Sequence, residues 1–316
     1  MRTIRDFGDI PDECRGSVAA IGNFDGVHLG HLQVINSAKE FAGHAGAKLA
    51  ALTFEPHPRQ YFAPDAPAFR LMNAETKARR LGTVGIELMF ELRFDAALAG
   101  LNAGEFSRDI LASGMGIRCA VVGEDFRFGK GRSGDAEQLS KLGGEHGFDT
   151  RIVSIAGDED CRWSSTSVRK ALSDGRTGDA ARILGHWHRI EGRVVSGQHR
   201  GHKLGFPTAN IPLDGLHLPR FGVYAVFVDV LSGPHKGRYE GSASIGIRPT
   251  FGENSANLEV FILDFAADIY GEAISVALVE FQRPEEAFST ADELVTQMVL
   301  DCDRSRKVLG AHAQPA

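Results

Sequence analysis

Along residues 15–185, apolar and polar positions follow two alternating patterns, one typical of strands and one typical of helices. Short apolar runs of strand length recur at residues 17–22, 48–54, 86–92, 118–123 and 150–155. Apolar residues at three- and four-residue spacing predict helices over residues 30–42, 73–83, 102–113, 135–146 and 166–173. Strands that alternate with helices predict an α/β fold, with a mostly parallel sheet and helices on its faces.

From Arg189 onward the pattern changes to strands without helices between them. Glycine-rich turns separate strand-like runs at residues 189–195, 222–230, 238–247, 258–265 and 274–282. This pattern predicts an antiparallel barrel or sandwich, and an amphipathic stretch at 290–308 predicts a C-terminal helix packed against it. A short helix ahead of Arg189 would end the first domain, so we predict two domains, 1–186 and 187–316.

Length and composition agree with two soluble domains. The chain has 316 residues, 43% hydrophobic and 24% charged. The formal net charge of −6 and the pI near 6.1 speak against a general nucleic-acid binder, but they leave room for a local basic site. The four cysteines are scattered without a C-x-x-C pair, and there is no membrane-length apolar run and no signal-peptide core. These features predict a cytoplasmic protein with reduced, inert thiols and no membrane partner.

The ten-residue stretch Gly-Asn-Phe-Asp-Gly-Val-His-Leu-Gly-His, which begins at Gly22, lies between a predicted strand and a predicted helix. Gly22, Gly26 and Gly30 allow the backbone to approach a ligand closely, and the unpaired N–H groups of a helix start attract phosphate. His28 and His31 could donate hydrogen bonds to a phosphate as negative charge builds on it. A metal pair fits less well, because such pairs are usually four residues apart and no third ligand is near. We therefore favour a nucleotide-handling site over two solvated histidines.

A second motif, Thr53–Arg59, directly follows another predicted strand. Pro56 and Pro58 stiffen it and hold the residues before them in extended geometry. Phe54 and the nearby Phe62 could offer their faces to a flat ring. The alternative interpretation is a rigid loop without a ligand.

A third motif, Val121–Arg132, is a glycine-rich loop in which Phe126 and Phe128 alternate with charged residues. Such a loop suits an aromatic ligand that bears phosphate. Alternatively, the two phenylalanines could pack beneath the loop as part of the local apolar core. The residues alone do not distinguish these two interpretations.

A fourth motif, Ser164–Lys170, places three hydroxyl groups at a predicted helix start. Ser164 or Ser165 is expected to cap this helix. The same hydroxyls, the free N–H groups and the cationic Arg169 would also suit an ATP polyphosphate.

These four motifs, in this order, resemble the adenylyltransferase half of the bacterial bifunctional riboflavin kinase/FAD synthetase family. The family reads G-x-F-D-G-V-H-x-G-H, T-F-x-P-H-P, G-x-D-F-x-F-G and S-S-T-x-x-R, and the first motif contains the H-x-G-H signature of nucleotidyltransferases. The resemblance implies a Rossmann-like nucleotidyltransferase domain that adenylylates FMN with ATP, gives FAD and releases pyrophosphate. It implies that magnesium offsets the polyphosphate charge.

The same resemblance assigns roles to individual residues. His28, His31 and Arg169 would be catalytic, with ATP bound between the histidine motif and the helix start that carries Arg169. Further ATP contacts would come from Gly22, Phe24, Asp25, Gly26, Ser165 and Thr166. Flavin contacts would come from Phe54, Pro56, Pro58, Phe62, Asp125 and Phe128.

In the second half, the stretch from Ser196 to Asn210 is rich in glycine and basic residues and suits phosphate groups. Thr208 and Asn210 supply neutral oxygens, which Mg²⁺ accepts beside phosphate oxygens and water. No Walker A motif is present, so a P-loop kinase is excluded. The alternative interpretation is a basic surface hairpin.

The sequence Gly-x-x-x-Gly-x-Pro-Thr-Ala-Asn from Gly201 resembles the riboflavin kinase fingerprint of the same family. Companion motifs follow at Gly222–Ala225, Ile245–Phe251, Leu258–Val260, Asp264-Phe265 and Asp268–Gly271. The resemblance implies an antiparallel β-barrel kinase domain with a C-terminal helix. It implies that Glu259 is the base for the riboflavin 5′-hydroxyl, although alternation along the strand alone would equally make it a solvated residue. ATP contacts would come from Gly201, Lys203, Gly205, Thr208 and Asn210, the last two also holding Mg²⁺.

The chain departs from the family at two places. Val260-Phe261 follow the strand glutamate where histidine is common, and Glu286-Ala287 stand where lysines are common. Neither departure involves a residue assigned to the chemistry.

We therefore predict a bifunctional enzyme that makes FMN from riboflavin in its C-terminal domain and FAD from FMN in its N-terminal domain, with ATP in both. Two alternatives are an enzyme with one active half and a flavin-binding regulatory protein without turnover. A binding-only protein would not need the full set of six residues His28, His31, Arg169, Thr208, Asn210 and Glu259.

Overall fold

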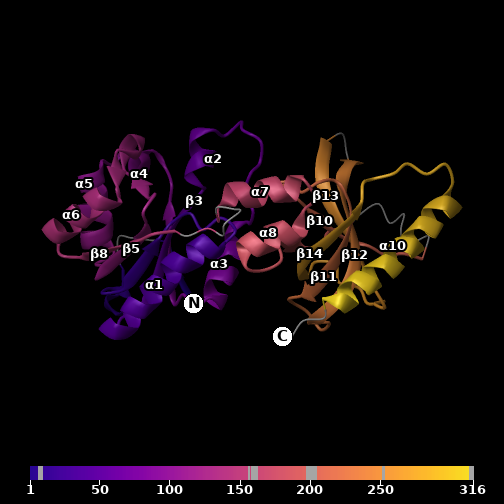
Figure 1. Ribbon diagram of the computed structural model, residues 1–316, viewed down its shortest axis with the longest axis horizontal. Helices are drawn as coiled ribbons and strands as arrows, with labels where there is room; N and C mark the ends of the chain where they lie inside the picture. Colours follow the sequence, from indigo (N-terminus) through magenta and orange to yellow (C-terminus); the bar gives the residue numbers. More distant parts are fainter. Residues whose placement is uncertain (6–9, 156, 158–162, 197–204, 251–252, 313–316) are drawn as a thin grey trace. The chain divides into compact units, whose positions relative to one another are not determined.

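The computed structural model describes residues 1–5, 10–155, 157, 163–196, 205–250 and 253–312 (Figure 1), without the side chains of 248–255. The chain divides into two compact units. Unit 1 comprises Met1–Pro67 and Ala74–Trp163, and unit 2 comprises Ala68–Asn73 and Ser164–Ala316. The predicted fold class is confirmed in both units.

Unit 1 is built on a parallel sheet with the strand order β1-β4-β3-β2-β5-β8. Its strands are β1 (Arg2–Ile4), β2 (Val18–Ile21), β3 (Leu49–Glu55), β4 (Leu88–Arg93), β5 (Cys119–Gly123) and β8 (Asp149–Val153). The central strands β2 and β5 are buried on both faces, which explains their continuous apolar sequences.

Helices pack against this sheet (Figure 1), among them α1 against β2 and β5 and α6 against β8. The longer helices are α1 (Leu29–Ala45), α3 (Ala74–Thr83), the π-helical η2 (Phe106–Gly114) and α6 (Ala136–His146). The short elements are η1 (Asp12–Cys14), α2 (Pro58–Phe62), α4 (Ala96–Gly100), α5 (Ala103–Glu105), β6 (Arg127–Phe128), η3 (Lys130–Arg132) and β7 (Gly134–Asp135). Helix α1 runs past its predicted end because the chain leaves the helix only at Gly46, whose φ of +60° is left-handed.

The strand order of unit 1 predicts where a ligand binds. From β2 the chain builds outward through β3 and β4 on one side, and through β5 and β8 on the other. The order therefore reverses between β2 and β5, and open parallel sheets bind ligands beyond the carboxyl ends of their strands at such a point. The loop after β2 holds the His28 motif, and the loop after β5 holds Asp125.

Unit 2 is an antiparallel six-stranded barrel with the order β10-β13-β12-β11-β14-β9. The strands are β9 (Arg189–Arg193), β10 (Ala209–Pro212), β11 (Gly222–Val230), β12 (Gly237–Thr250), β13 (Glu253–Ile262) and β14 (Ala273–Arg283). A bridge between Val195 and Asn210 joins the two ends of this order and nearly closes the barrel. Alternate residues such as Tyr224, Val226 and Val228 fill its interior.

Three helices pack with the barrel. The long C-terminal helix α10 (Ala291–Ala311) lies along β11 and β12 and begins with a capping box of Thr290 and Glu293. Helices α7 (Ser165–Ser173) and α8 (Thr177–Leu184) also belong to unit 2. The Thr177 hydroxyl donates to the carbonyl of Val279 on β14 at 2.7 Å, which anchors α8 to the barrel.

Among the described helices, none has the length and apolar character that a membrane crossing requires. Cys14, Cys119 and Cys302 are free and buried, and burial raises the pKa of the Cys119 and Cys302 thiols to about 11. These thiols therefore stay protonated and unreactive at neutral pH. Cys161 lies outside the described residues.

We expect His188 to make unit 2 sensitive to acid. Its side chain is 4% exposed, and burial, with smaller repulsion from His186 and His217, lowers its pKa to about 3. The unfolded chain takes up a proton near pH 6.5 and the folded chain does not, so stability falls as the pH drops below 6.5. Between pH 6.5 and pH 5, the wild type should lose about 2 kcal/mol of unfolding free energy through this group.

Chemical denaturation of wild type and His188→Leu at the two pH values tests this expectation. Leucine fills the buried position with an apolar side chain that does not titrate. Between pH 6.5 and pH 5, the variant should lose about 2 kcal/mol less unfolding free energy than the wild type. An equal loss in both proteins would show that His188 is not the group responsible.

Candidate active sites

His28 and His31 stack on each other at the start of α1. Their ring centroids are 3.6 Å apart with planes at 19°, and the edge of the His31 ring meets Phe24 with 5.3 Å between the centroids. His28 is the N-cap of α1, because its Nδ1 accepts a hydrogen bond from the His31 N–H at 3.3 Å. Little room is left at Gly30, where a Cβ would lie 3.0 Å from Ile155 and from the Trp163 carbonyl and 3.2 Å from the His28 ring.

The cap interaction indicates the tautomer of a neutral His28 ring. Since Nδ1 accepts, the ring proton of neutral His28 resides on Nε2, which is then a donor. Burial, followed by repulsion from His28, lowers the pKa of His31 well below 6.5. Both effects lower the pKa of His31 and favour its neutral imidazole at the helix N-terminus, a position suited to hydrogen bonding with phosphate.

The loop that leads to these histidines has an unusual backbone. Phe24 and Val27 have φ values of +50° and +44°, and Gly26 has +91°. Left-handed conformations at a phenylalanine and a valine are costly and persist only where the surroundings enforce them. The Phe24, Val27 and Asp25 side chains are buried, so packing holds the loop in one shape.

The second motif ends β3 and begins α2, with a cis peptide bond before Pro56. Phe54, Pro56 and Pro58 are partly buried there, and Phe62 is 67% exposed. Phe94, just after β4, contacts three aromatic rings edge to face: those of Phe54, Tyr61 and Phe62. Sequence reasoning missed Tyr61 and Phe94, although an aromatic residue after a predicted strand was a usable signal for Phe94.

The third motif has some residues on the surface and others in the apolar core. Asp125 is exposed beyond β5, whereas Phe128 is 7% exposed and belongs to the apolar core. Phe128 stacks on Phe126 with centroids 5.5 Å apart and also contacts Phe106. The structure thus supports the local-core interpretation that the sequence left open for Phe128.

The fourth motif begins α7 in unit 2. Ser164 is the N-cap and accepts from the Ser167 N–H at 3.1 Å, while Ser165 is partly buried and Thr166 is exposed. The Arg169 Nε donates to the carbonyl of Phe69 at 2.6 Å, and its guanidinium lies over the Phe69 ring at 5.2 Å.

In the barrel, Asn210 and Glu259 are register partners on β10 and β13. Leu258 and Val260 point into the barrel core, so Glu259 and Asn210 lie on the opposite face of the sheet. Asn210 is 5% exposed, and its Oδ1 accepts from the Asn257 amide at 2.8 Å. Sequence reasoning missed Asn257, which shares the face of Glu259 because it lies two positions away on the same strand.

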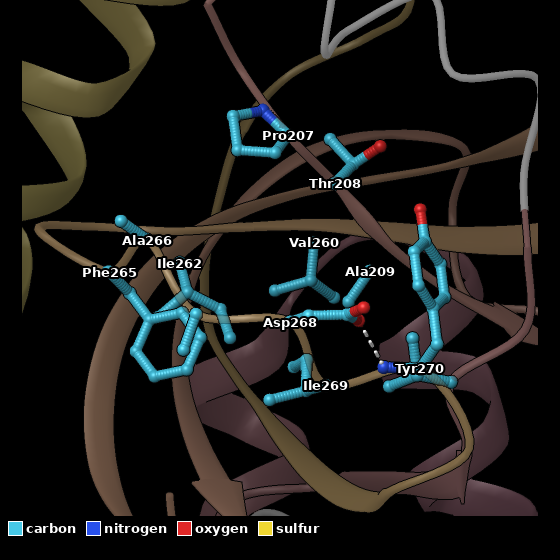
Figure 2. A pocket seen from close by; sticks show the side chains of 12 residues that line it. Pro207, Thr208, Ala209, Val260, Ile262, Phe265, Ala266, Asp268, Ile269 and Tyr270 are labelled. Carbon is cyan, nitrogen blue, oxygen red and sulfur yellow. Dashed lines mark hydrogen bonds between the residues drawn. The ribbon is translucent and has the colours of Figure 1, made fainter.

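Thr208 borders a cavity of about 230 Å³ at the start of β10. Figure 2 shows Phe265 and Tyr270 on opposite sides of this cavity, with Val260 between them. The Asp268 carboxylate accepts from the Tyr270 N–H at 2.9 Å, which fixes this turn of the lining. The cavity wall is mainly apolar with few polar groups, as in pockets for flat aromatic ligands.

Gly205 is exposed and has a φ of +84°. The predicted ATP contacts Gly201 and Lys203 lie outside the described residues. Within the described part of the chain, no group of three or more His, Cys, Asp or Glu side chains could hold a metal ion. Thr208 and Asn210 instead offer a hydroxyl and an amide oxygen, which suit Mg²⁺ bound mainly through nucleotide phosphates and water.

Comparison with known proteins identifies both halves. The family model described as FAD synthetase matches residues 10–167, and the one described as riboflavin kinase matches residues 184–309. A bifunctional riboflavin kinase/FMN adenylyltransferase from Escherichia coli K12 is 40% identical over 310 residues, 98% of this chain and 97% of the relative. The chain belongs to the bifunctional riboflavin kinase/FMN adenylyltransferase family.

The resemblance drawn from the motifs is thereby confirmed along nearly the whole chain. A family member of the same name from Pseudomonas fluorescens is 37% identical and covers 99% of both chains. A solved structure described as a macrolide-efflux protein from Streptococcus pneumoniae has a TM-score of 0.83 and 32% identity, covering 96% of this chain and 98% of that one. The arrangement of the two halves along the chain is thus shared with these relatives.

Proposed function

We infer that the chain is a bifunctional enzyme of flavin cofactor synthesis. It phosphorylates riboflavin with ATP to give FMN and ADP, and it adenylylates FMN with a second ATP to give FAD and pyrophosphate. We assign FMN formation to residues 187–316 and FAD formation to residues 1–186. The register pair Asn210–Glu259 carries the first assignment, and the stacked histidines at the start of α1 carry the second.

In the adenylyl transfer, a phosphate oxygen of FMN attacks the α-phosphorus of ATP and pyrophosphate leaves. We propose that His28 donates from Nε2 to the phosphate oxygens as their charge grows, with the α1 N-terminus adding its free N–H groups. His31 supports the His28 ring by stacking and by its N–H donor. Little covalent work falls to the protein, so positioning and charge stabilisation supply the rate enhancement.

The remaining contacts in this reaction are proposed from the family motifs. Gly22, Gly26, Phe24 and Asp25 would shape the loop around ATP, and the hydroxyls of Ser165 and Thr166 with the Arg169 cation would bind its phosphates. For the flavin we propose contacts from Phe54, Pro56, Pro58, Phe62 and Asp125, with Phe128 supporting their loop from the apolar core. The exposed ring of Phe62 is the aromatic surface most open to a ligand in this set.

In the kinase reaction, we propose that Glu259 accepts the proton of the riboflavin 5′-hydroxyl as its oxygen attacks the γ-phosphorus of ATP. A partly buried carboxylate on a rigid strand is a suitable base for this step. The apolar cavity beside Thr208 would hold the nucleoside part of ATP, with Gly201, Lys203 and Gly205 near its phosphates.

Magnesium is the proposed cofactor, held by Thr208 and Asn210 together with phosphate oxygens. When bound, the ion would offset the charge of the polyphosphate. We place the enzyme in the cytoplasm, since its cysteine pattern suits a reducing compartment.

Asn257 is expected to tune this magnesium site. Its amide donates to the Asn210 Oδ1 at 2.8 Å and so keeps that oxygen in a defined direction. Asn257→Ala removes a hydrogen bond worth about 1 kcal/mol, which corresponds to a roughly fivefold rise in the Mg²⁺ concentration for half-maximal FMN formation. Mn²⁺ binding in the presence of ATP, followed by electron paramagnetic resonance, should weaken in parallel. An unchanged metal dependence would contradict the role, and FAD formation from FMN serves as the internal control.

The function as a whole is tested by incubating the protein with riboflavin, ATP and Mg²⁺ and separating the flavins by chromatography over time. FMN should appear first and FAD after it, and a strong chelator should stop both. FMN that accumulates without FAD would show that only one half is active. Bound riboflavin without any conversion would favour the regulatory alternative.

A further inference from the structure

A buried lysine lies beneath the predicted flavin loop of unit 1. Lys77, on α3, is 2% exposed, which is rare for a lysine side chain. Its Nζ donates to the Thr53 hydroxyl at 3.0 Å and to the Phe54 carbonyl at 3.4 Å, and lies 3.6 Å from the Glu55 carboxylate. These acceptors belong to three consecutive residues at the carboxyl end of β3. The ammonium therefore holds the point where β3 passes into the predicted flavin loop.

Through Thr53, Lys77 is also linked by hydrogen bonds to the loop that leads to His28 and His31. The Thr53 hydroxyl accepts from Lys77 and itself donates to the carbonyl of Asn23 at 3.3 Å. Asn23 follows β2 and directly precedes Phe24–Val27, the segment in which Phe24 and Val27 have positive φ values. A continuous hydrogen-bonded path thus runs from Lys77 through Thr53 to the loop that leads to His28.

An ammonium group that is buried loses its hydration, which costs free energy. Lysine is therefore seldom fully buried unless it is paired. An apolar side chain of similar length would fill this place in α3 without that loss. The chain nevertheless keeps a lysine here, and its Nζ contacts Thr53, Phe54 and Glu55, the last three residues of β3 before the predicted flavin loop. Because Lys77 is buried, we expect its effect to pass through the end of β3 that it contacts and through the Thr53–Asn23 hydrogen bond.

We propose that Lys77 is a positioning residue for adenylyl transfer, which sets the flavin loop after β3 against the histidine loop after β2. This inference rests on the proposed function, because it presumes that the first loop binds FMN and the second acts on ATP. A misplacement of reacting groups by about an ångström can lower a rate by a factor of about one hundred. Lys77 would therefore act on the adenylyl transfer and not on riboflavin phosphorylation.

The test compares steady-state kinetics of FAD formation in Lys77→Met with those of wild type. Methionine preserves the length and apolar packing of the side chain without its charge and hydrogen bonds. We expect the KM for FMN to rise at least tenfold and kcat/KM to fall 10- to 100-fold, while kcat/KM for riboflavin phosphorylation stays within twofold. Lys141→Met, which changes an exposed lysine of the same unit, should match wild type in both reactions.

A pair of variants at Thr53 tests the path even where Lys77→Met fails to fold. Thr53→Val preserves the shape and removes the hydroxyl, and should raise the KM for FMN several-fold. Thr53→Ser retains the hydroxyl and should stay within twofold of wild type. Equal kinetics of the valine and serine variants would overturn the proposal.

A purely structural role gives a different pattern. Lys77→Met would then melt at a lower temperature, but its folded fraction would keep the wild-type KM for FMN, and this result also overturns the proposal. Failure of the proposed function is seen separately, because the wild type itself would then make no FAD from FMN.

Discussion

Glu259→Gln is expected to abolish FMN formation from riboflavin and to leave FAD formation from added FMN intact. The amide has the size of the carboxylate but cannot take the proton of the riboflavin 5′-hydroxyl. Removal of a general base typically lowers the rate by a factor of about 10² to 10⁴. Separate assays with riboflavin and with FMN as the starting flavin, each with ATP and Mg²⁺, measure the two activities in one preparation.

Glu240→Gln is the matched control for this experiment. Glu240 lies on the neighbouring strand β12 and carries no proposed role, so its substitution should leave both activities unchanged. Because Glu259 lies outside the barrel core, Glu259→Gln should also melt close to the wild-type temperature. A folded Glu259→Gln protein with normal FMN formation would remove Glu259 from the mechanism.

His28→Ala is expected to abolish the conversion of FMN to FAD and to leave riboflavin phosphorylation unchanged. The substitution removes the Nε2 donor that we propose for the growing charge, and it also removes the cap of α1. Loss of one such donor typically lowers kcat by a factor of about 10² to 10³. Assays of FAD formation with FMN and ATP measure the loss, and the kinase activity of the same sample shows that unit 2 is intact.

His28→Asn separates the two functions of this side chain. Asparagine is a good N-cap and can accept from the His31 N–H, but it provides no imidazole donor. If His28 acts on phosphate, His28→Asn should lose FAD formation as His28→Ala does, with a smaller loss of stability. Recovery of FAD formation in His28→Asn would reduce His28 to a helix cap.

Much of the fold was predictable because its patterns are local. β2 and β5 are buried on both faces, so they appear in the sequence as continuous apolar runs. The barrel strands were recognisable from strand-like runs between glycine-rich turns. Elements too short to show a period were missed, among them the edge strand β1, the strand β10 and the helices α2 and α4.

Of the candidate sites, only the residues that belong to a sequence motif were predictable. Nothing in the sequence showed that His28 caps α1 through Nδ1, or that Asn257 donates to Asn210, 47 positions away. Lys77 is separated from Thr53 by 24 positions and meets it only because α3 packs near the end of β3. For Phe128, the sequence alone could not choose between a ligand contact and the core. Such contacts depend on how helices and strands pack against one another. The spacing of apolar residues along the sequence does not reveal that packing.

The central claim is that two separate sites catalyse the two reactions, and complementation tests it most directly. Glu259→Gln and His28→Ala proteins are incubated with riboflavin, ATP and Mg²⁺, each alone and mixed in equal amounts, and the flavins are separated by chromatography. Alone, the first should leave riboflavin unchanged and the second should stop at FMN. The mixture should make FAD, because FMN released by one protein is adenylylated by the other. A mixture of folded proteins that makes no FAD would contradict two independent sites.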